Sequence, residues 1–303
     1  MGQLEDMQTF VRVVDAGSIS KAAEHLGVAK SAVSRRLAEL EQRLGSTLIN
    51  RTTRRSSLTD AGRLYYERAL RIIDDVDDMN AMAASSETSL AGRLRLAVPL
   101  SFGLEHLSPA LNEFSDQHPE LILHIDFSDR RIDLVQEGFD LAFRIAELGD
   151  SNLKARRITP IRLQACASPD YLARHGTPLT PAELQHHECL AYESSGSVFP
   201  WKLLDRAGRE HVIDPQARIV ANNGNFLCDM AVAGRGIMVS PTFIAWQALA
   251  RQQLVPVLPE FRIRPLNAYA VYPQTRFLSQ RARLLIDFLV AKFGDNPYWD
   301  QTL

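Results

Sequence analysis

The stretch SISKAAEHLGVAKSAVSRRLAELEQRLGSTLINRTTRRSSLT, residues 18–59, decides the fold of the N-terminal part of the chain. Apolar residues recur at helical spacing in residues 19–26 and again in residues 33–44, which predicts two helices with one buried face each. Ser18 is suited to cap the first helix, and a glycine follows each helix. Two short helices followed by a basic hairpin are an arrangement that proteins use to enter the DNA major groove.

The second helix carries small and basic residues on the face opposite its apolar stripe. Ser31, Ser34, Arg35 and Ala38 share this face, where small side chains allow close approach and an arginine can donate two hydrogen bonds to guanine. Basic residues beside it and in the hairpin are suited to phosphates. The candidate DNA contacts are Ser18, Lys30, Ser31, Ser34, Arg35, Arg36, Arg51, Arg54 and Arg55.

Positive charge is concentrated in the helix-turn-helix region, which indicates that this region, and not the chain as a whole, binds a polyanion. Residues 28–55 contain seven Lys or Arg and two Glu, a local charge of +5, whereas the whole chain of 303 residues has a net charge of −2. An apolar stripe at residues 7–14 predicts a preceding helix, and residues 47–49 and 56–58 are expected to be the two strands of the wing. The alternative is a three-helix module whose basic face contacts another protein.

Ordered motifs in this region resemble the winged helix-turn-helix of LysR-type transcriptional regulators. They are AAEHL at 22–26, AVSRRL at 32–37, LE at 40–41, LG at 44–45, Leu48, Arg51 and LTDAG at 58–62. The chain departs from the family at residues 29–31, where AKS replaces the usual SQP, and at Ile49, where phenylalanine is usual. The resemblance implies an operator-binding oligomer, a dimer or a tetramer or larger, that senses a small molecule, with RNA polymerase as a further candidate partner.

A helix is expected from residue 60 onward, with apolar residues spaced four and three apart along one narrow seam. Such a heptad seam favours pairing with a second copy, which would place two recognition helices on a two-fold operator. The alternative is a surface helix that packs on the next domain. The predicted seam consists of Tyr65, Ala69, Ile72, Val76, Met79 and Ala83. Residues 1–59 are therefore the expected DNA-binding domain and residues 60–91 the linker and dimerisation helix.

Strands and helices alternate beyond residue 92, which predicts an α/β domain with parallel strands. We expect two lobes, lobe I from about 92–162 and 268–303 and lobe II from about 163–267, in the type II periplasmic-binding-protein architecture that the resemblance also implies. The chain as a whole is thus expected to be a multidomain α+β protein: a winged helix-turn-helix, a long linker helix and a two-lobe effector domain.

Small ligands bind such sheets beyond the carboxyl ends of strands, often at helix N-termini. Residues at these positions are suited to a polar effector, including an anionic one, in the cleft between the lobes. Each of them also has an ordinary structural interpretation, such as a helix cap or, for Arg144, an ion pair with Glu147 or Asp140. The candidate effector contacts are Ser101, Phe102, Ser128, Arg144, Asn222, Asn223, Gly224 and Thr242.

Other functional classes lack their motifs. Three widely spaced cysteines argue against a disulfide framework, and the contiguous residues 186–189 (HHEC) do not suit a tetrahedral metal site. GRG at 234–236 lacks the third glycine of a dinucleotide fingerprint, and no nucleophile elbow occurs. We therefore expect no catalytic residues, metal or cofactor. Without an apolar run long enough for a membrane or an export signal, a cytoplasmic protein is expected.

Overall fold

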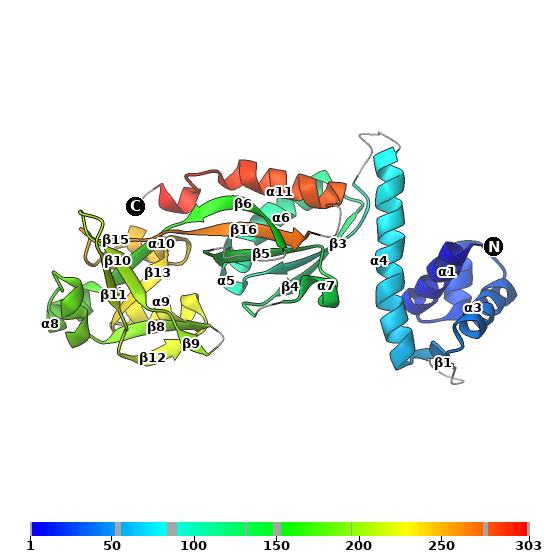
Figure 1. Cartoon of the computed structure of the whole chain (residues 1–303), viewed down its shortest axis with the longest axis horizontal. Helices are drawn as coiled ribbons and strands as arrows, with labels where there is room; N and C mark the ends of the chain where they lie inside the picture. Colours follow the sequence, from blue (N-terminus) through cyan, green and yellow to red (C-terminus); the bar gives the residue numbers. More distant parts are fainter. Residues whose placement is uncertain are drawn as a thin grey trace. The chain divides into compact units, whose positions relative to one another are not determined.

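The computed structural model describes residues 2–51, 56–83, 90–130, 132–147, 153–194, 196–274 and 278–301 (Figure 1). The chain divides into two compact units, residues 1–88 and residues 89–303. The first is mostly helical, and the described part of the second is an α/β structure with two larger sheets and one small one. Each unit is described by itself.

The first unit contains three short helices, a two-stranded wing and one long helix. Their bounds are α1 Gln3–Ala16, α2 Ile19–Leu26, α3 Lys30–Leu44, β1 Ile49–Arg51, β2 Ser56–Leu58 and α4 Asp60–Ala83. Ser18 caps α2, because its Oγ accepts a hydrogen bond from the backbone N–H of Lys21 at 3.3 Å. Gly17, Gly27 and Gly45 end the three short helices in the left-handed conformation that glycine adopts easily. The expected helix-turn-helix is therefore confirmed.

Apolar stripes of α1, α2 and α3 meet in one core, as the sequence predicted. Phe10, Val33 and Leu40 are completely buried in it. The long helix α4 also packs on this core: Ala69 is 1% exposed, and the Tyr65 ring lies 5.5 Å from the Phe10 ring in an edge-on arrangement. Tyr65 and Ala69 thus belong to the core of their own unit, which corrects their assignment to a seam between two copies.

The wing begins two residues later than predicted. Its strands pair antiparallel, with Ile49 opposite Leu58 and Arg51 opposite Ser56. The expected first strand covered residues 47–49, but Leu48 is instead buried in the helical core, so pairing starts only after it. The predicted wing residues Arg54 and Arg55 lie outside the described residues.

Lobe I of the second unit is a five-stranded sheet in the order β4-β3-β5-β16-β6. Strand β3 is parallel to β4 and β5, whereas β16 runs antiparallel to β5 and β6, so the sheet is mixed and not wholly parallel as expected. Helices α6 and α11 pack on it (Figure 1). The elements are β3 Gly92–Val98, α5 Leu100–Phe102, η1 Gly103–Leu107, α6 Ser108–Gln117, β4 Leu121–Phe127, α7 Leu134–Glu137, β5 Leu141–Ala146, β6 Leu153–Ile161, β16 Leu266–Pro273, α11 Gln280–Phe293 and η3 Tyr298–Asp300.

Lobe II is built on the sheet β12-β8-β13-β7-β14, with a small sheet β11-β10-β15 beside it. Helices α9 and α10 pack on the larger sheet around a second core. The elements are β7 Leu163–Ala167, α8 Pro169–His175, η2 Pro181–His186, β8 Cys189–Ser194, β9 Ser197–Val198, β10 Trp201–Leu204, β11 Glu210–Ile213, β12 Ala217–Ala221, α9 Gly224–Val232, β13 Ile237–Pro241, α10 Thr242–Ala250, β14 Val255–Pro256 and β15 Arg262–Ile263.

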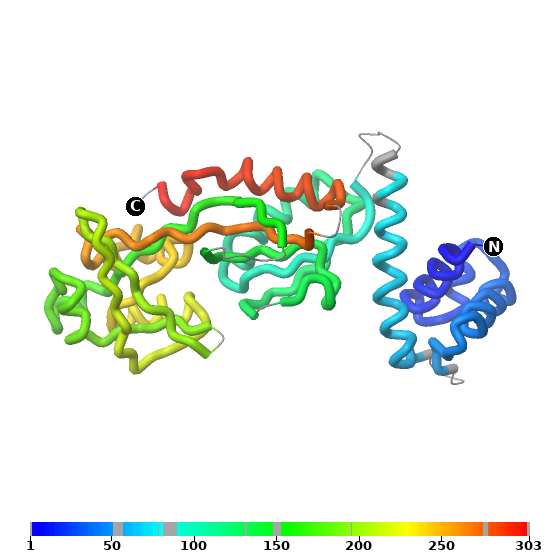
Figure 2. Tube along the Cα trace, viewed as in Figure 1, coloured from blue at the N-terminus to red at the C-terminus, as the bar shows by residue number. Residues whose placement is uncertain are grey.

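Two chain segments connect the lobes. The chain leaves lobe I after β6, enters lobe II at β7, and returns from β15 into β16. Strands β6 and β16 are antiparallel neighbours, so the outgoing and returning segments run side by side, green and orange in Figure 2. This double crossing is the two-lobe architecture that the sequence predicted.

Candidate DNA interface and effector site

Helix α3 exposes the residues that the sequence singled out for DNA. Lys30, Ser31 and Arg35 are exposed and Ser34 is half-buried, while the opposite side of the helix is buried in the core. The buried face fixes the orientation of the helix, because its apolar side chains have only one core to fill. Hydroxyl groups and a guanidinium are therefore presented together on the outer face of the second helix of a helix-turn-helix.

The basic residues of this region do not all face one way. Arg35 lies 3.8 Å from Glu39 one turn along α3, with both side chains largely exposed. Arg43 instead donates a hydrogen bond of 2.9 Å to Asp6 of α1, whose carboxylate is buried. The local charge of +5 thus includes at least one guanidinium that neutralises a buried acid, and the net positive charge available to a partner is smaller than the sequence count.

Arg36 also leans towards α1, where its guanidinium lies 3.7 Å from the Glu5 carboxylate. A phosphate that binds Arg36 therefore has to compete with the Glu5 carboxylate, and the phosphate contact of Arg36 stays a prediction. Arg51 lies in β1, but its side chain is outside the described ones, as are Arg54 and Arg55 entirely.

Glu41 of α3 anchors the start of the wing. Its Oε1 accepts hydrogen bonds from the backbone N–H groups of Leu48 at 2.8 Å and Ile49 at 3.1 Å. A carboxylate that accepts two backbone N–H groups makes strong, directional bonds. The Leu-Glu motif of α3 therefore has a mechanical explanation: Leu40 fills the core and Glu41 holds the wing.

The Thr-Asp-Ala-Gly motif at residues 59–62 joins the wing to α4. The Thr59 hydroxyl accepts a hydrogen bond of 2.9 Å from the N–H of Gly62 and donates one of 2.7 Å to the carbonyl oxygen of Thr47. Gly62 lies so close to the residue before the wing that a Cβ atom there would be 2.0 Å from the carbonyl oxygen of Leu48. Only glycine permits this approach, and the wing and α4 are thereby held as one piece.

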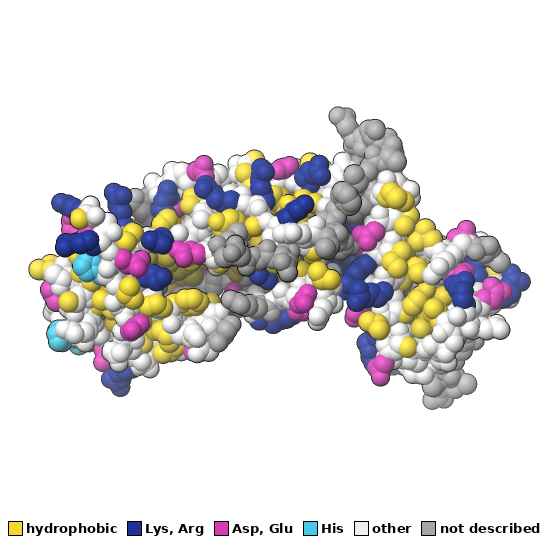
Figure 3. Space-filling view, in the orientation of Figure 1, with side chains coloured by type: hydrophobic (Ala, Val, Ile, Leu, Met, Phe, Trp, Pro, Cys, Tyr) yellow, Lys and Arg dark blue, Asp and Glu magenta, His cyan; other side chains and the backbone are white. Residues whose placement is uncertain are grey.

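Exposed apolar side chains remain on α4 beyond its contact with the core. Ile72 and Met79 of the predicted seam are 43% and 61% exposed, Val76 is half-buried, and Leu64 near the start of the helix is 60% exposed. Figure 3 shows hydrophobic side chains along the visible face of this helix. The side chain of Ala83 is outside the described ones. The distal half of the predicted seam therefore has apolar side chains that its own unit does not cover.

In the α/β unit, two predicted effector contacts belong to the core and are corrected here. Phe102 is 1% exposed and is packed within the lobe I core. Thr242 is 4% exposed, and both its N–H and its hydroxyl donate to the carbonyl oxygen of Arg162. The location of Phe102 and Thr242 just after a strand was not enough to predict that their side chains point into the protein core. Ser101, at the start of the lobe I helix, is half-buried.

Asp129 occupies the position that the sequence assigned to an anionic ligand group. Its Oδ1 accepts a hydrogen bond of 3.1 Å from the N–H of Leu100, at the start of the helix that contains Ser101. Burial raises the pKa of Asp129. Burial, and to a smaller extent the negative charge of Asp129, also raises the pKa of Tyr192 in lobe II. The Asp129 carboxylate therefore acts on Tyr192 across the junction of the lobes, and sequence reasoning missed both residues.

A second polar contact across the junction joins Asn225 of α9 to Glu105, because the Asn225 amide donates to the Glu105 carboxylate. Burial raises the pKa of Glu105, and this hydrogen bond opposes the rise. Neither residue had a sequence signal beyond its place near a helix start. The junction thus offers two carboxylates where the sequence suggested amide and guanidinium donors.

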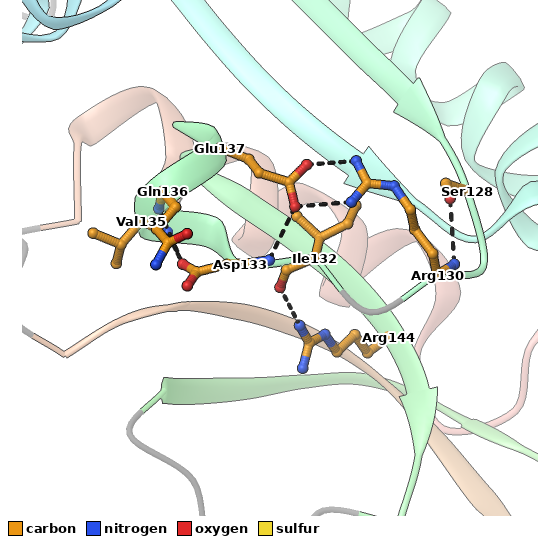
Figure 4. A network of polar contacts seen from close by, with 8 residues as sticks. All are labelled: Ser128, Arg130, Ile132, Asp133, Val135, Gln136, Glu137 and Arg144. Carbon is orange, nitrogen blue, oxygen red and sulfur yellow. Dashed lines mark hydrogen bonds and ion pairs between the residues drawn. The ribbon is translucent and has the colours of Figure 1, made fainter. Parts of the chain in front are cut away.

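Arg144 and Ser128 take part in a network that holds the loop after β4 (Figure 4). The Arg144 guanidinium donates to the carbonyl oxygen of Ile132 at 3.0 Å, and the Ser128 hydroxyl accepts from the N–H of Arg130 at 3.2 Å. Arg130 in turn makes a two-point ion pair with Glu137, at 2.8 Å and 2.5 Å. Ser128 lies in this loop, next to Asp129, whereas Arg144 lies in β5 and holds the loop from there through its bond to the Ile132 carbonyl oxygen.

The Asn-Asn-Gly sequence at 222–224 begins α9, as expected. Asn223 caps the helix, with its Oδ1 accepting from the N–H of Phe226 at 2.9 Å. Asn222 is exposed, whereas Gly224 is buried against the Ile244 side chain. The structure thus assigns Asn223 and Gly224 structural roles and leaves Asn222 accessible.

Other chemistry has little support in the described part of the chain. Cys166, Cys189 and Cys228 are free thiols, all buried, and burial raises the pKa of Cys189 and of Cys228 to about 11. No group of three or more His, Cys, Asp or Glu among the described residues is arranged to hold a metal ion. Over the same residues, no helix combines the length and the apolar character needed to cross a bilayer.

Comparison with known proteins accounts for both units. Residues 4–63 match the family model described as bacterial regulatory helix-turn-helix protein, lysR family, and residues 87–294 match the LysR substrate binding domain. The chain belongs to the LysR family of transcriptional regulators. The HTH-type transcriptional regulator CrgA of Neisseria meningitidis serogroup C is 38% identical over 301 residues, covering 96% of this chain and 97% of that protein.

Further LysR relatives agree along the whole chain. The HTH-type transcriptional regulator DmlR of Escherichia coli is 34% identical and covers 97% of this chain and 95% of its own length. The solved structure of CrgA from Neisseria meningitidis has a TM-score of 0.61 at 36% identity and covers 96% of this chain and 99% of that one. The full-length structure of the Vibrio cholerae virulence activator AphB has a TM-score of 0.60 at 26% identity, with coverages of 96% and 99%. This chain is therefore a LysR-type regulator, and these relatives are named as transcriptional regulators.

Proposed function

We propose that this LysR-type regulator binds a two-fold DNA operator as an oligomer, reads bases with the outer face of α3, and responds to a small molecule that binds where its two lobes meet. The observation that carries the proposal is the exposed face of α3, where Ser31 and Arg35 lie opposite a fully buried stripe. An arginine on such a face can make bidentate contact with guanine, and nearby hydroxyls can approach base edges or phosphates.

Selection of sites from random duplex DNA tests the DNA part of the proposal. We expect an inverted repeat, and we expect Arg35→Ala to weaken binding to it by about 1–3 kcal/mol while binding to unrelated DNA changes little. Arg12→Ala is a matched control, because it removes an exposed arginine from α1. Affinity should fall steeply with salt. Salt-independent binding, or equal losses for Arg35→Ala and Arg12→Ala, would favour a head that contacts protein.

Apolar side chains at Ile72, Val76 and Met79 support pairing along the distal part of α4. The proximal part is used within the unit, so the proposed interface is shorter than the seam predicted from sequence. A dimer would place two α3 helices on the two halves of an inverted repeat. Assembly of dimers into tetramers or larger forms is part of the same proposal and is measured by sedimentation of the full chain.

The effector part of the proposal rests on polar side chains that meet from both lobes. Asn225 of lobe II donates a hydrogen bond to the Glu105 carboxylate of lobe I, and the charge of Asp129 in lobe I contributes to the raised pKa of Tyr192 in lobe II. Ser101 is half-buried at the start of the lobe I helix. A ligand that binds both lobes more tightly in one arrangement shifts the protein towards it, and only by that difference in affinity. An anionic effector that uses the Leu100 N–H has to displace the Asp129 carboxylate.

A thermal-shift screen with separate sets of carboxylates, amines and neutral polyols tests the effector site. Ligands should raise the melting temperature of the wild type, and Asp129→Asn should change which chemical set is selected, because it removes the charge at the Leu100 N–H. Arg144→Lys keeps the charge but loses the planar guanidinium that holds Ile132. If ligands stabilise the wild type and all of these variants equally, the site lies elsewhere.

A further inference from the structure

The C-terminal segment that follows α11, residues 294–300, lies across the junction of the lobes, at the red end of the chain in Figure 2. Trp299 is completely buried. Its ring packs against Phe102 and Phe293 of lobe I, at centroid distances of 5.8 and 5.4 Å, and against Phe243 of lobe II at 6.4 Å. One side chain near the end of the chain thus contacts both lobes.

His106 links the same three parts through hydrogen bonds. Its Nδ1 lies 2.6 Å from the hydroxyl oxygen of Tyr298, and its Nε2 lies 3.0 Å from the carbonyl oxygen of Phe243 in α10. Because a carbonyl can only accept, Nε2 carries the proton and Nδ1 accepts from Tyr298. The Tyr298 ring also lies edge-on to Trp246 of α10, at 5.7 Å. A lobe I side chain is therefore bonded to lobe II at one end and to the C-terminal segment at the other.

The segment is also fixed to the chain crossing itself. Arg162, the residue between β6 and β7, lies with Nη1 2.5 Å from Oδ2 of Asp300, whose side chain is 1% exposed. At the other end of the segment, the Thr159 hydroxyl donates to the carbonyl oxygen of Gly294 at 2.8 Å, and Arg157 pairs with Asp295. These contacts tie residues 294–300 to β6 and to the point where the chain passes from one lobe to the other.

Two polar atoms of the segment lack a hydrogen-bond partner among the described residues. They are the Nε1 of Trp299 and the Oδ1 of Asp300, and both are buried. A buried polar group without a partner opposes the docked state, because it has lost water without replacement. Packing and ion pairing therefore hold the segment in place although two of its buried polar atoms lack a partner in the described part of the chain. Release of the segment would return both atoms to water. The segment also lies beyond residue 294, where the match to the LysR substrate binding domain ends.

We propose that residues 294–300 form a strap that fixes the resting angle between the two lobes, with Trp299 as its buried anchor and the Arg162–Asp300 and His106–Tyr298 contacts as its fastenings. Release of the strap would let the lobes sample other angles without unfolding either lobe. The proposal concerns the geometry of the α/β unit, so it holds whether or not an effector binds between the lobes.

Distances between spin labels on the two lobes test the strap. Labels at Ile122→Cys in lobe I and Leu179→Cys in lobe II are suitable, because these positions are 52% and 77% exposed and the native thiols are buried. The labelled full-length chain is diluted into an excess of unlabelled chain, so that distances within one chain dominate. Asp300→Asn and Tyr298→Phe each weaken one fastening and preserve side-chain shape.

We expect a wider distance distribution in both variants and about tenfold faster hydrogen exchange in α10, with exchange in the distant helix α8 unchanged. A chain that ends after residue 294 should show the largest effect, and the two point variants decide the question if that chain does not fold. Arg206→Gln is the control, since it removes an exposed ion pair with Glu260 in lobe II. An unchanged distribution and unchanged α10 exchange in both point variants would overturn the proposal.

Discussion

Gly62→Ala is expected to destabilise the DNA-binding unit even though alanine favours helices over glycine. A Cβ at this position would lie 2.0 Å from the carbonyl oxygen of Leu48 and 2.9 Å from its carbonyl carbon. Ordinary carbon–oxygen contacts are about 3.3 Å or longer, so the wing and α4 must separate by about 1 Å. Overpacking of this kind costs about 1–3 kcal/mol, and the helix preference of alanine returns about 1 kcal/mol. We therefore expect a net loss of about 0–2 kcal/mol, and a value towards the upper end because the clash is with backbone atoms and not with a flexible side chain.

Denaturant unfolding of the full-length protein, followed by the helical signal of the N-terminal unit, measures this loss. Ala61→Gly is the matched control: position 61 is exposed, so this change should cost about 1 kcal/mol through helix preference alone and leave the wing in place. Gly62→Ala should in addition weaken DNA binding, because the wing moves with Leu48. A Gly62→Ala protein as stable as the wild type, with unchanged DNA affinity, would refute the close approach on which this reasoning rests.

Three other perturbations have outcomes set by the described contacts. Asp6→Ala should cost about 1–2 kcal/mol of unfolding free energy, because it breaks a buried carboxylate's bond to a half-exposed Arg43, and an Asp6–Arg43 double-mutant cycle should show coupling of similar size. Burial lowers the pKa of His106 to about 4, so between about pH 6.5 and pH 4 the histidine is protonated in the unfolded chain but neutral in the folded chain. The free energy of unfolding should therefore fall by about 3 kcal/mol from pH 7 to pH 4, and His106→Gln should make it depend less on pH. Met79→Lys should shift sedimentation towards monomer, while Asn80→Lys, which adds the same charge at the next position of α4, should leave assembly unchanged.

Local pattern was enough to predict the helix-turn-helix from the sequence. Apolar spacing and helix caps act within a few residues, so the bounds of α2 agreed with the prediction, and α3 began and ended near the expected positions. The sequence pattern located the apolar stripe of α4 but not its partner, for a physical reason. A four-three spacing describes an apolar stripe but not what covers it, and Tyr65 and Ala69 are covered by α1 of the same unit while Met79 is exposed.

The contacts around the proposed effector site could be predicted only in part. Strand ends placed Ser101 and Ser128 at one edge of the lobe I sheet, but the inward turn of Phe102 depends on the aromatic core around it. Asp129 was missed although it follows Ser128, because its partner, the Leu100 N–H, is 29 residues away in sequence. Contacts that join distant segments need the three-dimensional arrangement, and no local pattern contains them.

Because the wing and α4 are joined tightly, the helix-turn-helix moves as a rigid body at one end of a long helix. The close contacts of Gly62 and Thr59 hold the wing against the start of α4. Helix α4 is 24 residues long, about 36 Å at 1.5 Å per residue. A tilt of roughly 10° about the far end of that helix would carry the head through about 6 Å, nearly two base-pair steps at about 3.4 Å each. Angular changes too small to disturb any core could therefore decide which operator spacing a pair of heads can span.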